Sequence, residues 1–333
     1  MKRSGGYTVL LTGATGFVGS AVLNTLRHSG PSAEPSASAE RTVRPVIIRA
    51  LARKPPQPDK AETATANLEW TTADLTDPAS LHGVAEGADA LVHLAARIDG
   101  DEDQCAAVNV HGTRALMDEA RRAGVGRIVH LSTTAVYGPG PHRGIEVDGT
   151  VPAPVSPASR SRLAGEQPAL DAGAVVLRAG LILGAGDRWV VPALAELRER
   201  VPGGWDGGTG LLSVVDVSDL ARLITALALR PQAAESGVHH AAHPEPVPSG
   251  ALLAELTALG VLPPVPGEDW PWEECLRRLR ENPGRMSERQ FALLARDHWY
   301  RSEDIWRIAD CPPGPGPLAR LATAAPWYRQ HLR

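Results

Sequence analysis

Short apolar runs alternate with helix-like segments through the first 185 residues of the chain. The runs are rich in Val, Ile, Leu and Ala, a composition typical of strands that are buried on both faces. Strands that are separated by helical patterns predict βαβ units and therefore a parallel sheet. We expect five such strands, at residues 7–11, 46–52, 88–96, 126–132 and 174–180.

The pattern changes after about residue 188, where helix and loop segments lead to a strand and a helix over 211–229. The expected fold class is α/β, a doubly wound parallel-sheet Rossmann fold with a smaller C-terminal substrate lobe. The Rossmann domain covers 1–187 with a return segment at about 211–240, and the lobe comprises 188–210 and 241–333. Residues 29–45, rich in Ser, Ala, Pro and Glu, are interpreted as a surface insertion.

Composition narrows the class of protein without naming a function. The chain has 333 residues, of which 43% are hydrophobic and 22% charged, and its net charge is −4. These values are ordinary for a globular protein, and they argue against a nucleic-acid or membrane partner. Glycines interrupt the N-terminal apolar run, so no signal peptide is expected, and three unevenly spaced cysteines favour a reduced, cytoplasmic setting.

The first strand leads into the stretch "TGATGFVG", which places Gly13, Gly16 and Gly19 at the opening of a helix. Glycine permits a tight turn and lets backbone N–H groups approach a pyrophosphate, while the helix N-terminus supplies partial positive charge. The stretch therefore predicts a dinucleotide site. Its expected contacts are Gly13, Thr15, Gly16, Phe17, Val18 and Gly19.

In this motif the chain resembles the extended short-chain dehydrogenase/reductase family, whose members include the NAD-dependent epimerases and dehydratases. Further segments match in order: "ADLTD", "HLAA", "VNVHGT", "LSTTAVYG" and "LRAGLILGAGD". The resemblance implies that Asp74 and Leu75 meet adenine, and that Asn109 lies behind the active site. It also implies that Thr133 polarises a carbonyl group. Further cofactor contacts are implied at Leu94, Ala95, Ala96, Ala179, Gly180, Leu181 and Ile182.

The choice of cofactor is predicted from the end of the second strand. Enzymes that prefer NAD place an acid there for the ribose 2′-hydroxyl, whereas a 2′-phosphate requires arginine. This chain has Arg53 and Lys54, with no carboxylate before Asp59. We therefore expect NADPH, with NADH less favoured; the alternative is that both residues are solvated turn residues.

The catalytic segment of the family commonly reads YxxSKxxGE, in which tyrosine is the acid and lysine lowers its pKa. Alignment through "SRLAGE" puts Ala158 at the tyrosine position and Arg162 at the lysine position. There is no tyrosine between Tyr137 and Tyr300, and no lysine after Lys60. Arginine is too weak an acid to donate a proton at neutral pH. The resemblance therefore implies only that Arg162 binds the cofactor.

Three functions remain open. The first is a reductase whose proton comes from water or from a hydroxyl group of the substrate. The second is a non-catalytic NADPH-binding sensor or scaffold, and the third, a nucleotide-sugar epimerase or lyase, is least favoured because it needs the same tyrosine. The chain resembles atypical reductases of actinomycete secondary metabolism that act on aromatic polyketides (angucyclinones). We therefore expect an NADPH-dependent ketoreductase acting on a polycyclic aromatic ketone.

Other residues are weaker candidates. Substrate contacts are expected at Thr134, Tyr137, Trp189 and Trp205, with structural roles as the alternative; Tyr137 is also weighed as a replacement acid. The stretch "HHAAHPEP" (239–246) is not expected to bind a metal, because its spacing suits zinc only in a helix. His93 is interpreted as a core histidine, and Asp216 and Asp219 as helix caps. Extended reductases often dimerise through two helices, and the sequence leaves a homodimer open.

Overall fold

The computed structural model describes residues 6–29, 45–56, 67–230, 234–264 and 267–332. Most of the expected insertion, residues 30–44, lies outside these ranges. The chain divides into two compact units. The first comprises 1–132, 156–177 and 221–238, and the second comprises 133–155, 178–220 and 239–333. Residues 133–155 thus group with the second unit, although the sequence pattern placed them in the nucleotide-binding domain.

Most of the central sheet of seven strands lies in the first unit, and its strand order is β12-β7-β5-β4-β1-β2-β3. Pairing is parallel from β5 through β4, β1 and β2 to β3. This is the doubly wound order, and it confirms the predicted fold class. The strands are β1 (Tyr7–Thr12), β2 (Val46–Ala52), β3 (Leu68–Thr72), β4 (Ala90–His93), β5 (Ile128–Thr133), β7 (Val175–Ala179) and β12 (Gly237–Ala241).

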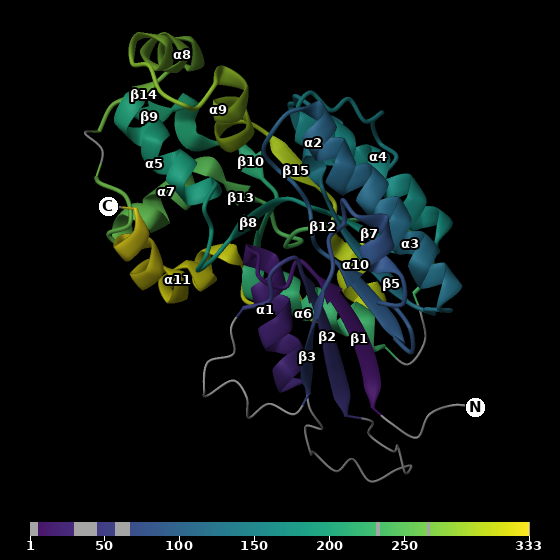
Figure 1. Cartoon of the computed structure of the whole chain (residues 1–333). Coiled ribbons are helices and arrows are strands. Elements are labelled where there is room, and N and C mark those ends of the chain that lie inside the picture. The colour runs from purple at the N-terminus through teal and green to yellow at the C-terminus, as the bar shows by residue number, and fades with distance from the viewer. Residues whose placement is uncertain (1–5, 30–44, 57–66, 231–233, 265–266, 333) are drawn as a thin grey trace. The chain divides into compact units, whose positions relative to one another are not determined.

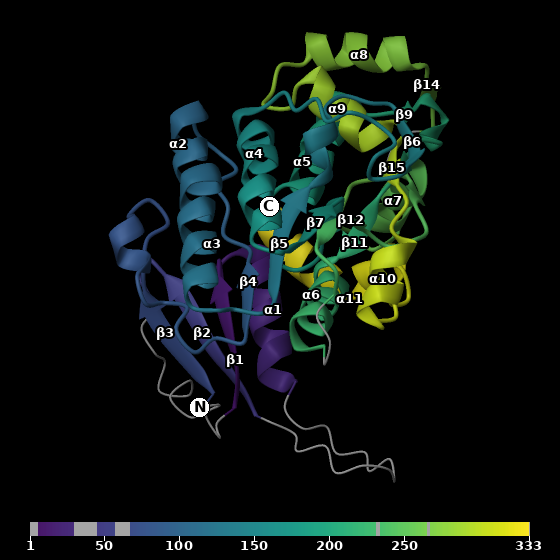
Figure 2. The same cartoon turned by 90° about the vertical axis from the view of Figure 1, so that its right-hand side faces the viewer.

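Helices cover both faces of this sheet (Figure 2). They are α1 (Phe17–His28), α2 (Glu102–Ala106), α3 (Thr113–Arg122), α4 (Pro157–Asp171) and α6 (Val217–Leu229), with short helical turns at η2 (Pro78–Leu81) and η3 (Ala107–Gly112). Apolar residues of α3 and α4 pack on strand residues such as Leu10, Leu91 and Val176 to form one buried cluster. Burial of this apolar surface holds the sheet and helices together.

The second unit has its own core. A four-stranded sheet runs in the order β13-β10-β15-β6, and β8 pairs with β11 and β9 with β14. The strands are β6 (His142–Ile145), β8 (Leu181–Leu183), β9 (Gly204–Trp205), β10 (Leu211–Leu212), β11 (Val214–Asp216), β13 (Val247–Pro248), β14 (Asp269–Trp270) and β15 (His298–Tyr300). The helices are η4 (Thr134–Tyr137), α5 (Val190–Arg200), η5 (Asp206–Gly208), α7 (Ser249–Ala258), α8 (Trp272–Glu281), α9 (Glu288–Ala295), α10 (Glu303–Ala309) and α11 (Pro317–His331).

The structure also refines several local predictions. Strand β3 was not predicted, because its residues are only half-buried or exposed and form no apolar run. Asp216 caps a helix as expected, since its carboxylate accepts the Ser218 N–H at 2.8 Å. Asp219 lies in the first turn of α6 and also accepts both arms of the Arg320 guanidinium, at 2.8 and 3.0 Å. Among the described residues, no helix is long and apolar enough to cross a membrane.

Candidate active site

The loop between β1 and α1 is closed by the three predicted glycines. Gly13 has φ +73°, and a Cβ atom there would lie 2.7 Å from the Ala95 nitrogen. At Gly19 a Cβ atom would overlap the Gly13 carbonyl oxygen. Gly13 is therefore required by its positive φ and by close packing, and Gly19 is required by close packing. The Gly16 N–H donates to the Gly13 carbonyl at 2.9 Å and completes the turn.

Helix α1 begins directly after this turn, with Gly16 as its N-cap. No side chain caps it, and its first turn contains no acidic residue. The N–H groups and the positive end of the helix dipole are therefore offered to an anion, which fits the pyrophosphate of a dinucleotide. Thr15 is exposed beside the turn, and Phe17 and Val18 are half-buried.

Thr12 is a site residue that the sequence analysis missed. Its hydroxyl oxygen accepts the N–H groups of Leu94 and Ala95, both at 3.2 Å, and it bonds to His93 Nδ1 at 2.7 Å. These bonds hold residues 94–96, which follow β4, beside the glycine turn. The signal was present in the sequence, because Thr12 opens the quoted TGATG motif.

Asn109 positions the same loop from behind. Its amide accepts the Arg97 N–H at 2.7 Å and donates to the Arg97 carbonyl at 2.8 Å and to Ser161 at 2.9 Å. The side chain is buried, and it lies in the wider helical turn η3. Asn109 therefore holds the loop after β4 against α4.

The predicted adenine contacts lie after β3. The Asp74 carboxylate accepts the Thr76 N–H at 2.9 Å and its hydroxyl at 2.8 Å. The backbone bond to Thr76 is the main cause that lowers the pKa of Asp74, and the charge of Arg53 adds to it. Arg53 and Lys54 follow β2 as exposed residues. Leu75 packs against Gly112, where a Cβ atom would be only 2.7 Å from the Leu75 Cβ.

Helix α4 carries the segment "ASRSRLAGE". It starts with a capping box between Ser156 and Ser159, and Ala158 lies half-buried in its first turn. The Arg162 guanidinium donates to the Leu131 carbonyl at 2.9 Å, in strand β5. Burial lowers the pKa of Arg162 to about 10, and the nearby Glu166 carboxylate opposes that shift. Arg162 therefore remains a cation at neutral pH and is bound to the backbone of the sheet.

Two histidines lie close to this cation. His93 is fully buried, bonded to Thr12 and, at 3.0 Å, to Thr113, which confirms its interpretation as a core histidine. Its ring stacks on His130 at 5.0 Å. Burial, helped by the Arg162 charge, lowers the pKa of His93 to about 4 and that of His130 well below its usual value. Both imidazoles are neutral at pH 7.

In the second unit, Thr133 ends β5 and caps η4. Its hydroxyl oxygen accepts the Ala135 N–H at 3.2 Å, which leaves it able to donate its own proton to a ligand. Thr134 is also half-exposed. Tyr137 differs, because only 2% of it is exposed. Its hydroxyl receives a bond from Arg178 at 2.7 Å and lies 2.7 Å from His240 Nε2. This buried setting supports a structural role for Tyr137.

Trp189 and Trp205, the two tryptophans expected to contact substrate, differ in how much of the ring is exposed. Trp205 is 1% exposed, its Nε1 donates to the Val201 carbonyl at 3.0 Å, and Phe291 packs edge-on at 4.9 Å. Its proposed contact with substrate is therefore corrected, because the ring is part of the core. Trp189 is 39% exposed and keeps a free surface. Of the remaining predicted contacts, Ala179 is buried, and Gly180, Leu181 and Ile182 are half-buried around the start of β8.

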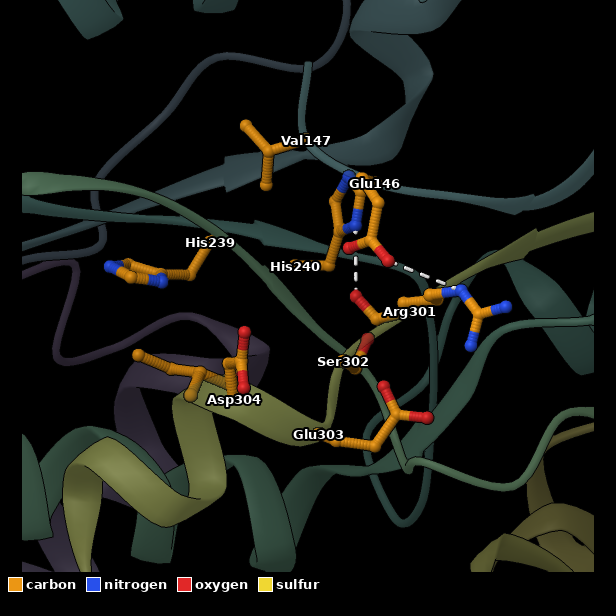
Figure 3. A pocket seen from close by; sticks show the side chains of 9 residues that line it. Glu146, Val147, His239, His240, Arg301, Ser302, Glu303 and Asp304 are labelled. Atoms are coloured by element: carbon orange, nitrogen blue, oxygen red, sulfur yellow. Dashed lines mark hydrogen bonds and ion pairs between the residues drawn. The ribbon is translucent and has the colours of Figure 1, made fainter. Parts of the chain in front are cut away.

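A pocket of about 290 Å³ lies among residues 146–147, 239–240 and 301–305 of the second unit (Figure 3). Glu146 pairs with Arg301 at 3.2 Å, and His240 Nδ1 bonds to the Arg301 carbonyl at 3.0 Å. Its charged lining is unlike the apolar surface that a flat aromatic ketone requires. Within the described ranges, no group of three His, Cys, Asp or Glu side chains could hold a metal ion.

Fold and site together define a Rossmann-type protein with a glycine turn and an uncapped helix N-terminus after β1. The chain belongs to the NAD dependent epimerase/dehydratase family, because the sequence model of that family matches residues 9–240. It is 29% identical to the 2-alkyl-3-oxoalkanoate reductase of Stenotrophomonas maltophilia, over 90% of this chain and 92% of that one.

Two further comparisons are informative. The chain is 37% identical to sterol demethylase protein B of Methylococcus capsulatus, over 40% of this chain and only 37% of that protein. The structure of MoeE5 in complex with UDP-glucuronic acid and NAD superposes with a TM-score of 0.71 and 24% identity, covering 97% of this chain and 99% of that one. This second likeness concerns the fold.

Proposed function

We propose that the protein is an NADPH-dependent ketoreductase that acts on a polycyclic aromatic ketone of the polyketide (angucyclinone) type, in antibiotic biosynthesis. The observation that carries the proposal is helix α4, which has Ala158 and Arg162 where the resemblance expects tyrosine and lysine. Epimerases and dehydratases need that tyrosine as a base, whereas a reductase needs only a proton donor. The same loss is shared with the 7-ketoreductase of simocyclinone biosynthesis, which the chain resembles.

The residues of the cofactor cradle fit NADPH. A Cβ atom at Gly13 would fill the space beside the loop after β4, and the open end of α1 suits a pyrophosphate. Arg53 and Lys54, exposed after β2, can bind a 2′-phosphate, for which a guanidinium is well shaped. NADPH, when bound, supplies the hydride.

The chain's own residues would then handle the carbonyl oxygen. Thr133, whose hydroxyl is free to donate, would polarise the carbonyl and stabilise the developing alkoxide. Arg162 remains charged at neutral pH, and it adds a positive field beside β5 without acting as an acid. The proton comes from water or from a hydroxyl group of the substrate. A phenol beside the ketone holds an internal hydrogen bond that stabilises the same alkoxide.

NADPH oxidation, followed by absorbance, tests the proposal with α-tetralone and its peri-hydroxy derivative. We expect turnover of the hydroxylated ketone at the higher rate. Equal rates on both ketones would contradict a proton borrowed from the substrate. Tight NADPH binding without oxidation across a panel of hydroxylated aromatic ketones would instead favour a non-catalytic NADPH-binding protein.

A further inference from the structure

Thr12, His93 and His130 form a row across three neighbouring strands. Thr12 of β1 pairs with His93 of β4, and His93 pairs in turn with His130 of β5. Residues in register on parallel strands point to the same face of a sheet, so the three side chains lie side by side. The rings of His93 and His130 stack at 5.0 Å, and both residues are buried. Helix α3 contributes Thr113, whose hydroxyl lies 3.0 Å from His93 Nε2.

The hydrogen bonds of Thr12 determine where the protons of this row lie. A threonine hydroxyl has two lone pairs and one proton. The N–H groups of Leu94 and Ala95 occupy the lone pairs, both at 3.2 Å. The proton is therefore left for the remaining partner, His93 Nδ1 at 2.7 Å, which must be unprotonated to accept it. The proton of the neutral imidazole then lies on Nε2, which donates to Thr113.

A different protonation of His93 would disturb the loop after β4. With a proton on Nδ1, the imidazole would donate to the Thr12 oxygen and compete with the loop N–H groups for its two lone pairs. Leu94 or Ala95 would then lose its partner. This loop touches the glycine turn, since a Cβ atom at Gly13 would lie 2.7 Å from the Ala95 nitrogen. The protonation of His93 therefore affects the loop that lines the expected dinucleotide site.

We propose that His93 is a positioning residue of the cofactor site, which holds the loop after β4 in its binding geometry through Thr12. The inference rests on the cofactor site of the proposed function, and it does not depend on which ketone is reduced. It assigns His93 one defined state in the protein that binds the dinucleotide, the neutral tautomer with its proton on Nε2.

The surroundings of His93 favour this neutral state. Burial lowers the pKa of His93 to about 4, and the positive charge of Arg162 on α4 acts in the same direction. His130, which stacks on the ring from β5, is itself kept neutral because burial lowers its pKa. Thr12 and Thr113, the partners from β1 and α3, carry no charge. The imidazole is therefore an uncharged acceptor for the Thr12 hydroxyl at neutral pH.

Two substitutions of His93 separate its two hydrogen bonds. Asparagine places its amide oxygen near the position of Nδ1, so His93→Asn keeps an acceptor for Thr12. Glutamine reaches the position of Nε2, so His93→Gln keeps a partner for Thr113 and leaves the Thr12 hydroxyl without its acceptor. In titration calorimetry, affinity for NADPH and for NADH should stay within about threefold of wild type in His93→Asn and weaken about tenfold in His93→Gln. Both variants lose the buried ring, so a purely structural role would weaken them alike.

His130→Asn is the matched control, because it removes the other buried imidazole of the row and leaves the bonds of Thr12 unchanged. Among the described residues, His130 Nδ1 has no hydrogen-bond partner. The affinity of this variant for NADPH should stay within about threefold of wild type. Thermal melting of each variant identifies any loss of fold.

Nitrogen-15 NMR of the wild-type protein at pH 7 tests the same assignment without any variant. The His93 ring signals, assigned by correlation to the backbone, should show a proton on Nε2 and none on Nδ1, because Nδ1 accepts the Thr12 proton. A proton on Nδ1 would overturn the positioning role.

The calorimetric outcomes keep the two proposals distinct. Equal affinities in His93→Asn and His93→Gln, whether reduced or not, would overturn the positioning role and leave the reductase standing. The expected pattern of cofactor binding, with no ketone reduced, would support the positioning role and contradict the proposed function. A wild-type protein that binds neither NADPH nor NADH would overturn both proposals.

Discussion

The loop between β1 and α1 and the helix α4 both lie in the first unit, and they have kept different parts of the family pattern. The loop retains the glycines of the family motif, and a Cβ atom at Gly13 or Gly19 would collide with neighbouring backbone. Helix α4 retains its packing residues: Ser161 bonds to Asn109, Gly165 abuts the Asn109 carbonyl and Glu166 binds Ser132. The resemblance to the family places Ala158 and Arg162 of this helix at the positions of the tyrosine and the lysine.

The difference shows that packing and chemistry are carried by different residues of one helix. Ser161, Gly165 and Glu166 place α4 against η3 and β5, and none of them needs the tyrosine or lysine to do so. The packing of α4 therefore does not identify the reaction, because function depends on the chemistry of the site and not on the fold. The account predicts that changes in the loop abolish function, whereas changes at the tyrosine position have little effect.

The largest effect is expected from Gly13→Ala. The new methyl group would meet the Ala95 nitrogen and push the loop after β4 away from the cofactor cradle. NADPH affinity, measured by titration calorimetry, should fall more than about 100-fold, because misplaced backbone donors lose several hydrogen bonds to phosphate. Gly124→Ala is the matched control. Its φ of +70° carries similar strain, but nothing lies within 4 Å of the added atom. Equal losses of NADPH affinity in Gly13→Ala and Gly124→Ala would contradict a specific role of the β1–α1 loop in binding NADPH.

Arg53→Ala tests the cofactor preference. Removal of a charge-assisted bond to the 2′-phosphate should raise KM for NADPH about 10- to 100-fold and leave KM for NADH within about twofold. Steady-state kinetics with the two cofactors measures the ratio. A variant that weakens both cofactors equally would show that Arg53 supports the turn after β2 and does not select NADPH.

The burial of His93, with a smaller contribution from the Arg162 charge, gives the fold a measurable pH dependence of stability. The pKa of His93 is lowered to about 4 in the fold, against a usual value of about 6.5, so the unfolded chain binds more protons between these values. Stability is therefore full above pH 6.5 and is lost as the pH falls towards 4. Between pH 7 and pH 5, His93 should account for a loss of about 2 kcal/mol in the free energy of unfolding.

His93→Asn removes this titration, and urea unfolding at both pH values measures it. The variant should lose about 2 kcal/mol less than the wild type over the same interval, although it starts from a lower stability at pH 7. His28→Asn, at the exposed end of α1, is the control. An identical pH dependence in His93→Asn and wild type would show that His93 does not titrate in this window.

The smallest effect is expected from Ala158→Ser. In a relative that uses tyrosine at this position, loss of the acid costs about 100- to 10,000-fold in rate. Here the proton is expected to arrive by another route, so kcat for the peri-hydroxy ketone should stay within about twofold of wild type. A fall of more than about tenfold would place Ala158 in direct contact with the reacting atoms.

The fold and the glycine turn after β1 could be predicted because both depend on local patterns. Apolar runs marked the strands β1, β2, β4, β5 and β7, and the glycine spacing marked the turn before α1. Strand β3 escaped because an edge strand needs no continuous apolar run. Trp205 was misinterpreted because neighbouring residues do not reveal that Phe291 covers its ring.

The bond between His142 and Tyr300 could not be predicted from local sequence at all. His142 and Tyr300 are 158 residues apart, and they meet only because β15 pairs with β6. The sequence around β15 contains no pattern that indicates its pairing with β6. The absence of a tyrosine at position 158 was plain from the sequence, whereas the contacts that bury Tyr137 and Tyr300 required the structure.

We propose that this chain transfers hydride although α4 carries no tyrosine or lysine. The most direct measurement uses the full chain, NADPH labelled with deuterium at the transferred position, and peri-hydroxy α-tetralone, with product analysed by mass spectrometry. The account predicts an alcohol with one deuterium on the former carbonyl carbon. Saturating NADPH binding with no labelled alcohol, for this ketone and for larger hydroxylated polycyclic ketones, would contradict it.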